Sequence, residues 1–330
     1  MSEKVVIIGS NSFSGSHFID HCLDQDLGVV GISRSPELNP VFLPYKQNKN
    51  ASRFVFHALD LNHNLDAITE VISSFAPDYV VNFAAQGMVA ESWKQPEHWF
   101  QTNVVANIRL HDRLRKMTFL KKYVHVSTPE VYGSMQGLVP ENTSYNPSTP
   151  YAVSRAATDM SLMSFLGAYR FPVVFTRSAN VYGSSQQLYR IIPRAILSFA
   201  TGKKLPLHGG GHSIRSFIHI KDVARGTLKV AREAVPGEIF HFSTSQNISI
   251  RTLVETIAAR MGVSFQDSVD VVEERLGKDA AYLLDNAKAK RVLGWRDQVS
   301  LDEGLNDCIR WTRENLEILK RLPSEYIHKE

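Results

Sequence analysis

The first half of the chain alternates short apolar runs with segments of helical period, and this rhythm limits the possible folds more than any other feature. The apolar runs are Val5 to Ile8, Val29 to Ile32, Phe54 to Ala58, Tyr79 to Phe83, Tyr123 to Ser127 and Val173 to Thr176. Apolar residues recur at helical spacing between them, from Phe18 to Leu23, Leu65 to Phe75, Trp99 to Met117 and onward from Tyr151. Short strands alternating with helices are typical of a parallel sheet covered on both faces. The sequence therefore predicts an α/β, doubly wound fold.

The rhythm loosens after Val181-Tyr182-Gly183. Gly/Pro-punctuated segments follow, and then helices around Leu253 to Met261 and Leu305 to Leu319. We expect a smaller, irregular C-terminal α/β domain that closes over the carboxyl edge of the sheet. The first domain is predicted at residues 1–180 with a return segment near 217–243, and the second at 181–216 and 244–330.

Composition excludes several classes of partner. The net charge of +4 comes from 37 basic and 33 acidic residues without a run of five like charges, so no nucleic-acid-binding tail is predicted. Cys22 and Cys308 lie far apart, and the spacing of His208, His212 and His219 matches no usual metal-ligand set, so no disulfide framework or metal site is expected. The N-terminus lacks a signal sequence and no apolar run has membrane-spanning length, which predicts a cytoplasmic protein without a membrane partner.

The loop Gly9-Ser-Asn-Ser-Phe13-Ser-Gly15 follows the first predicted strand and opens the first helix. In this position glycines allow a tight turn, close approach of the backbone to a pyrophosphate, and close packing of helix on strand. Ser12 occupies the middle glycine position of a GxxGxxG pattern, which weakens the motif. Its position between strand and helix nevertheless favours a dinucleotide site at Gly9, Ser12, Phe13 and Gly15.

The second strand ends in Ser33-Arg34, where NAD-binding proteins usually carry an acidic residue. An acid would repel the 2′-phosphate of NADP, whereas a serine and an arginine would bind it. We therefore favour NADP and keep NAD as the alternative.

Ordered motifs along the chain resemble the extended short-chain dehydrogenase/reductase family and, within it, the nucleotide-sugar 4,6-dehydratases of the GDP-mannose and dTDP-glucose type. These are Gly9 to Gly15, Asp60-Leu61, Ala84-Ala85-Gln86, Thr102-Asn103-Val104, Ser127-Thr128-x-Glu130-Val131-Tyr132-Gly133, Tyr151-x-x-x-Arg155, Arg177 to Gly183, Gly211 to Val223, and Asp285 to Trp295. The resemblance implies a Rossmann sheet and assigns further cofactor contacts to Asp60, Leu61, Ala84, Ala85, Gln86, Asn103, Tyr151 and Arg155.

The resemblance implies that Thr128, Tyr151 and the cation at position 155 form a redox centre. Oxidation of a sugar C4 alcohol needs a base, and a tyrosine serves as one only where a nearby positive charge favours its phenolate. Four residues along a helix place Tyr151 and Arg155 on one face. The family uses lysine at position 155, so Arg155 is a departure that puts the rate of reaction in question.

Glu130 is expected to remove the C5 proton once C4 is a ketone, so that the C6 hydroxyl is lost as water. The dTDP-glucose dehydratases carry an acid just before this glutamate, whereas this chain has Pro129, which cannot donate a proton. The GDP-mannose dehydratases use a serine there, and UDP-glucuronate decarboxylases share the Ser-Thr-x-Glu-Val-Tyr-Gly pattern. A 4,6-dehydratase is therefore favoured; the alternatives are a related C4 dehydrogenase, epimerase or decarboxylase, or a catalytically weakened dinucleotide-binding protein.

By the family pattern Asn180, Arg190 and Arg215 are the candidates to bind the diphosphate of a nucleotide-diphosphate hexose. The resemblance also implies a homodimer, in which the helices from Trp99 to Met117 and from Tyr151 to Tyr169 pair with their copies.

Overall fold

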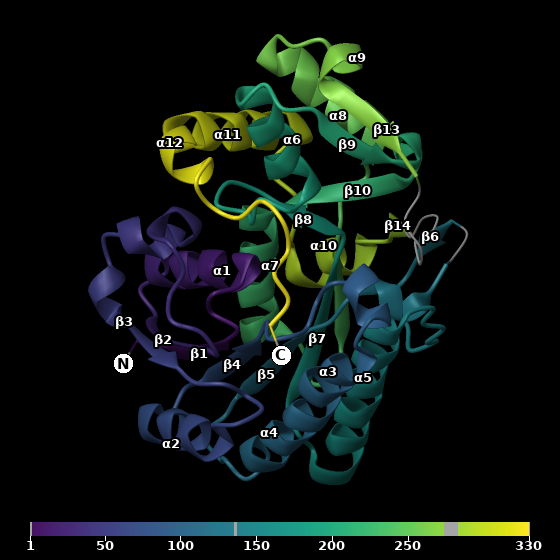
Figure 1. Ribbon diagram of the computed structural model, residues 1–330. Coiled ribbons are helices and arrows are strands. Elements are labelled where there is room, and N and C mark those ends of the chain that lie inside the picture. Colours follow the sequence, from purple (N-terminus) through teal and green to yellow (C-terminus); the bar gives the residue numbers. More distant parts are fainter. Residues whose placement is uncertain (1, 135–136, 274–282, 330) are drawn as a thin grey trace.

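In the computed structural model, which describes residues 2–134, 137–273 and 283–329, seven strands form one parallel sheet (Figure 1). The strand order is β11-β7-β5-β4-β1-β2-β3, and each neighbouring pair runs parallel. The strands are β1 (Lys4–Ile8), β2 (Gly28–Ser33), β3 (Phe54–Ala58), β4 (Tyr79–Asn82), β5 (Lys122–Val126), β7 (Val173–Ser178) and β11 (Ile239–Phe242). The predicted doubly wound α/β fold is confirmed.

Helices cover both faces of this sheet. One apolar core lies under α1 (Phe13–Asp24), α7 (Ile220–Glu233) and α10 (Ala287–Leu293), and the other under α2 (Leu65–Phe75), α4 (Asn107–Leu114) and α5 (Pro150–Tyr169). Because side chains alternate along a strand, Tyr123 packs into the second core and its neighbour Val124 into the first. All strands end at one carboxyl edge, where the loops that carry the predicted site residues begin.

A second region with its own apolar core lies beyond that edge (Figure 1). Its core is formed by α6 (Ile191–Ala200), α8 (Ile250–Met261), α11 (Leu301–Glu314), β9 (Leu205–His208) and β13 (Val269–Val272). The remaining strands and α-helices of the described chain are β6 (Leu138–Val139), β8 (Asn180–Tyr182), β10 (Ile214–His219), β12 (Asn247–Ser249), β14 (Leu283–Leu284), α3 (Pro96–Phe100), α9 (Phe265–Ser268) and α12 (Leu316–Leu319). Division of the chain at the predicted boundaries stays a proposal.

The helix expected from Trp99 to Met117 is interrupted. It consists of α3, a π-helical stretch η5 (Gln101–Ala106) and α4. The amide of Asn107 donates to the carbonyl of Thr102 across 2.9 Å, an interaction that takes up a main-chain acceptor of the widened turn. A π-helical turn shifts the side chains that follow it relative to a continuous α-helix, and such turns are frequent at functional sites.

Candidate active site

The loop after β1 is folded tightly against the loop after β4. Gly9 has a φ of +84°, and a Cβ atom at this position would lie 2.6 Å from the nitrogen of Ala84. Only glycine fits such a close approach in this conformation. The Gly9 carbonyl would in turn lie 2.3 Å from a Cβ atom at Gly15, so both glycines are required for this geometry.

Ser12 caps the helix that follows. Its hydroxyl accepts a hydrogen bond from the nitrogen of Gly15 at 3.0 Å, which makes Ser12 the N-cap of α1. The side chain is thus folded back toward the helix, which accounts physically for a serine at the middle glycine position. Phe13 lies in the apolar core, where its ring packs against His17.

The residues after β2 and β3 have separate roles. The hydroxyl of Ser33 accepts from the nitrogen of Asn11 at 3.0 Å, whereas Arg34 is exposed and donates to the carbonyl of Lys329 at 3.1 Å. The carboxylate of Asp60 accepts from the nitrogen of Asn62, which shapes the turn after β3. Leu61 is buried in the sheet core, so its part in the site is to hold this turn in place.

The loop after β4 is fixed by a buried asparagine. Ala84 donates its N–H to the side-chain oxygen of Asn82, and Ala85 is exposed. Asn103 accepts from the nitrogen of Gln86 at 2.8 Å and donates to the Ser154 hydroxyl at 2.9 Å. Asn103 therefore joins this loop to α5.

Three of the predicted catalytic residues meet at the ends of β5 and α5. Thr128 is the N-cap of the short 3-10 helix η6 (Pro129–Tyr132), which directs Glu130 toward it. The Thr128 hydroxyl donates to the Glu130 carboxylate, and it lies near enough to the Tyr151 phenol to lower the pKa of that group. Tyr151 lies in the first turn of α5, which begins at Pro150 after the N-cap Thr149. The hydroxyl, the carboxylate and the phenol therefore share one site.

The charges around Tyr151 oppose one another. Burial and the Glu130 carboxylate raise the pKa of the Tyr151 phenol to about 12, although Arg155 and Arg190 favour its ionised form. The expectation of a phenol made basic by Arg155 therefore describes only one of the influences on this group. In the protein without ligands, the phenol is held protonated at neutral pH.

Arg155 is buried below Tyr151, with 2% of its surface exposed. Its Nη2 atom donates to the carbonyl of Val126 and lies 3.2 Å from His125 Nε2. The Nε and Nη1 atoms have no hydrogen-bond partner within the described part of the chain. Two donors of this guanidinium are therefore buried without a partner among the described residues.

A buried polar network supports this arrangement from beneath. Asp159 follows Arg155 by one helical turn and accepts from Arg177 Nη2 and from the Ser127 hydroxyl, each at 2.7 Å. Arg177 also donates to Tyr132, whose hydroxyl lies 2.7 Å from His241. We refer to His125, Tyr132, Asp159, Arg177 and His241 as the buried network.

The buried network was not predicted from the sequence. Tyr151, Arg155 and Asp159 recur at four-residue intervals on one helix, and that spacing was the available signal for Asp159. The contact of Lys329 with Arg34 and Gln86 was also missed, because a contact between distant parts of a chain leaves no local pattern.

The predicted substrate residues are not all brought together. Arg190 begins α6 and is close enough to influence the pKa of Tyr151. Asn180 and Arg215 lie instead on β8 and β10 of the three-stranded sheet of the second region, where Asn180 donates to the carbonyl of Ser216. Among the described residues, no group of three His, Cys, Asp or Glu side chains could hold a metal ion, and no helix is long and apolar enough to cross a membrane.

A doubly wound sheet with this residue set at its carboxyl edge defines a dinucleotide-dependent enzyme of the extended short-chain dehydrogenase/reductase class. The family model described as GDP-mannose 4,6 dehydratase matches residues 6–308. The chain belongs to this family, and the prediction of a nucleotide-sugar 4,6-dehydratase-type enzyme is confirmed.

Individual proteins agree with this assignment. The chain is 29% identical to the dTDP-glucose 4,6-dehydratase of Escherichia coli, over 97% of this chain and 96% of that protein. The solved dTDP-glucose 4,6-dehydratase of Streptomyces venezuelae, with NAD and TYD bound, superposes with a TM-score of 0.88 at 30% identity, covering 95% and 98% of the two chains. A UDP-glucose 4-epimerase from Thermotoga maritima, solved with UDP-glucose, has a TM-score of 0.86 at 25% identity and covers 95% and 99%.

Proposed function

We propose that the protein dehydrates a nucleotide-diphosphate hexose by oxidation at C4, proton removal at C5, loss of the C6 hydroxyl as water and return of hydride to C6. The observation that carries the proposal is that the Glu130 carboxylate, hydrogen-bonded to Thr128, lies near enough to the Tyr151 phenol to raise its pKa. A 4,6-dehydratase needs one group at the C4 hydroxyl and a separate base at C5, within the width of one sugar ring. Tyr151 and Glu130 supply these two groups at one site.

The site fits a nicotinamide dinucleotide. The tight Gly9 loop leads directly into the N-terminus of α1, a position where phosphates bind, and two donors of Arg155 are buried without a partner among the described residues. When bound, the dinucleotide supplies reversible hydride transfer. Gly9, Ser12 and Gly15 would hold its pyrophosphate and Arg155 its nicotinamide ribose.

Each acid–base step is assigned to a residue of this chain. Tyr151 takes the proton of the C4 hydroxyl after its phenol has released its own proton to solvent, and Arg155 and Arg190 lower the cost of that ionisation. Glu130 then removes the C5 proton and returns it to the departing C6 hydroxyl, because Pro129 has no proton to give. Thr128 orients both groups, and a proton from solvent restores C5.

We propose NADP as the dinucleotide, with NAD as the alternative. Ser33 and the exposed Arg34 stand at the end of β2, where a 2′-phosphate would lie. Parallel calorimetric titrations with NADP and NAD test this choice. Tighter binding of NAD would contradict it.

Pro129 favours a second candidate. A C4 epimerase needs no proton donor for a leaving hydroxyl group, so a proline is compatible with that reaction. Incubation with GDP-, dTDP-, UDP- and CDP-hexoses separates the two functions. Formation of a 4-keto chromophore with loss of one water supports dehydration, whereas a change of C4 configuration without loss of mass supports epimerisation.

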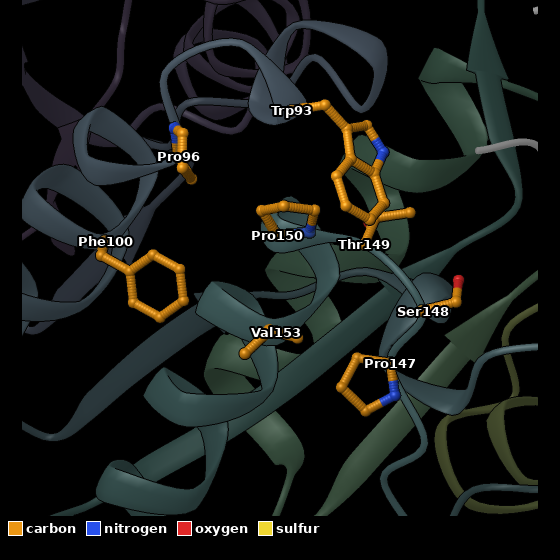
Figure 2. Close-up of a pocket in the computed structure, with 8 residues that line it drawn as sticks. All are labelled: Trp93, Pro96, Phe100, Pro147, Ser148, Thr149, Pro150 and Val153. Atoms are coloured by element: carbon orange, nitrogen blue, oxygen red, sulfur yellow. The ribbon is translucent and has the colours of Figure 1, made fainter. Parts of the chain in front are cut away.

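We also propose a homodimer formed through α3, α4 and α5. Figure 2 shows Trp93, Phe100 and Val153 around one apolar pocket between α3 and the start of α5, together with Pro96, Pro147, Ser148, Thr149 and Pro150. Farther along α5, the Met160 side chain is 58% exposed. Exposed apolar side chains gathered on two helices are suited to burial against a second copy.

Sedimentation of a Met160→Lys variant tests the dimer, with Val235→Lys as the control because Val235 is similarly exposed but lies between α7 and β11. We expect only Met160→Lys to sediment as a monomer. A wild-type protein that sediments as a monomer would contradict the proposal.

A further inference from the structure

The C-terminal segment of the chain returns to the cofactor crevice. After α12 it runs back across the second region and ends beside the carboxyl edge of the sheet (Figure 1). An ion pair of 2.6 Å between Arg194 and Glu325 fixes the start of this segment. The rings of Tyr326 and Tyr189 pack edge to face, with their centres 5.4 Å apart. We call residues 323–329 the strap.

The end of the strap is held by aromatic contacts with α3. The His328 ring lies parallel to Trp99, with ring centres 5.1 Å apart, and its Nε2 atom is 2.9 Å from His98 Nδ1. Trp99 is fully buried in this arrangement. The strap is therefore part of the packing at the mouth of the crevice.

The last described residue engages the predicted cofactor contacts directly. The carbonyl of Lys329 accepts from Gln86 Nε2 at 2.6 Å and from Arg34 Nη1 at 3.1 Å. The Lys329 ammonium group donates to the Ser35 hydroxyl at 3.0 Å. Gln86 has only 2% of its surface exposed, so the strap covers it.

One carbonyl oxygen thus joins the loops after β2 and β4, which flank the Gly9 loop after β1. A dinucleotide that extends from Arg34 to the nicotinamide site has to cross the space between these loops. A donor that already points at a carbonyl cannot serve a phosphate or ribose oxygen in the same direction. We infer that the strap and the dinucleotide compete for the outer part of this crevice, so that the strap must leave before the dinucleotide is fully seated.

The contacts of the strap are suited to release. The Glu325 side chain is 70% exposed, and exposed ion pairs contribute little to stability. The other contacts include the stacking of His328 on Trp99 and on His98, the edge contact of Tyr326 and a few hydrogen bonds, and phosphate oxygens and water can replace those hydrogen bonds. The apparent affinity for the dinucleotide is then reduced by the fraction of molecules in which the strap is closed.

The inference rests on the proposed dinucleotide binding and is tested in the full-length protein by titration with NADP and NAD. Glu325→Ala loosens the strap far from the crevice and should tighten dinucleotide binding by up to about fivefold, the most that an exposed ion pair supplies. His328→Ala removes the stack and a hydrogen bond and should tighten it by about tenfold. Ile327→Ala is the matched control, because this side chain is 62% exposed on the same segment.

Hydrogen exchange of residues 324–329, measured with and without saturating dinucleotide, provides the second measurement. Faster exchange in the presence of dinucleotide, together with the tighter binding of both variants, would support competition. Slower exchange, or weaker binding by both variants, would show that the strap closes over a bound dinucleotide and would overturn the inference. If neither dinucleotide binds the wild type or the variants, the proposed function fails as well. If the dinucleotide binds wild type and variants equally and hydrogen exchange of the strap does not change, only the inferred competition is ruled out.

Discussion

The side chains beneath Tyr151 and those along the outer rim of the crevice are held in different ways. Arg155, Asp159 and Arg177 are buried and tied to main-chain carbonyls or to one another. Arg34 and Arg190 are exposed, and each lies at the end of a strand or the start of a helix. The chemistry is therefore placed by rigid elements, whereas recognition of the nucleotide depends on long side chains that can adjust. We expect changes in the first group to affect turnover and stability, and changes in the second to affect binding.

The largest expected effect is that of Glu130→Gln. An amide cannot remove the C5 proton, so dehydration should fall by about 10²–10⁴-fold, the usual contribution of a general base. Oxidation at C4 should continue, which would be seen as reduced dinucleotide in single-turnover absorbance. Glu97→Gln on α3, an exposed position, is the control and should change neither rate. Unchanged dehydration by Glu130→Gln would remove this residue from the mechanism.

The next effect concerns the ion pair between Asp159 and Arg177. Asp159→Asn leaves a buried guanidinium without its carboxylate and should lower the free energy of unfolding by about 3–5 kcal/mol, as is typical for breaking a buried pair. Asp112→Asn, which breaks the exposed pairs with Arg115 and Lys116, should cost less than about 1 kcal/mol. Urea denaturation compares the two variants. Equal losses of unfolding free energy would mean that the buried ion pair contributes no more to stability than the exposed pairs.

Acid should lower the free energy of unfolding, because two buried histidines are neutral in the folded protein. Burial lowers the pKa of His111 and of His241 to about 3, below the ordinary value of 6.5. The unfolded chain then binds protons that the folded protein does not, so stability falls as the pH drops from about 6.5 toward 3, by about 1.4 kcal/mol per pH unit for each histidine.

Denaturation at several pH values measures this slope, and His111→Gln should reduce it. The control is His208→Gln, at a histidine that is partly exposed on β9. A slope that His111→Gln leaves unchanged would contradict the assignment.

The smallest effect is expected at the rim. Arg215→Ala removes a candidate phosphate contact and should raise KM for the nucleotide sugar by about tenfold, the loss of one charge-assisted hydrogen bond. The kcat should stay close to that of the wild type, because Arg215 lies on β10 of the three-stranded sheet, whereas Tyr151 lies on α5. Steady-state kinetics separate the two constants. A large fall in kcat with little change in KM would place Arg215 among the catalytic residues.

The sequence predicts the sheet well because its strands other than the edge strand β3 are largely buried on both faces and therefore appear as apolar runs. The meeting of Thr128, Glu130 and Tyr151 follows from similar reasoning, since loops after parallel strands gather at one edge. The direction of the Arg155 side chain could not be predicted, because a long guanidinium has several acceptors within reach, and here it turns to the carbonyl of Val126. The π-helical turn at Gln101–Ala106 depends on packing that a helical pattern does not record.

Tyr151, Arg155 and Asp159 are spaced four residues apart along α5, so the helix fixes the positions of these three side chains relative to one another. Each further residue in a helix turns its successors by about 100° around the axis. One inserted or deleted residue between Tyr151 and Asp159 would therefore separate the phenol from its buried support, whichever residues were present. A replacement of equal length keeps the positions of Tyr151 and Asp159 on the helix, as an arginine at position 155 does.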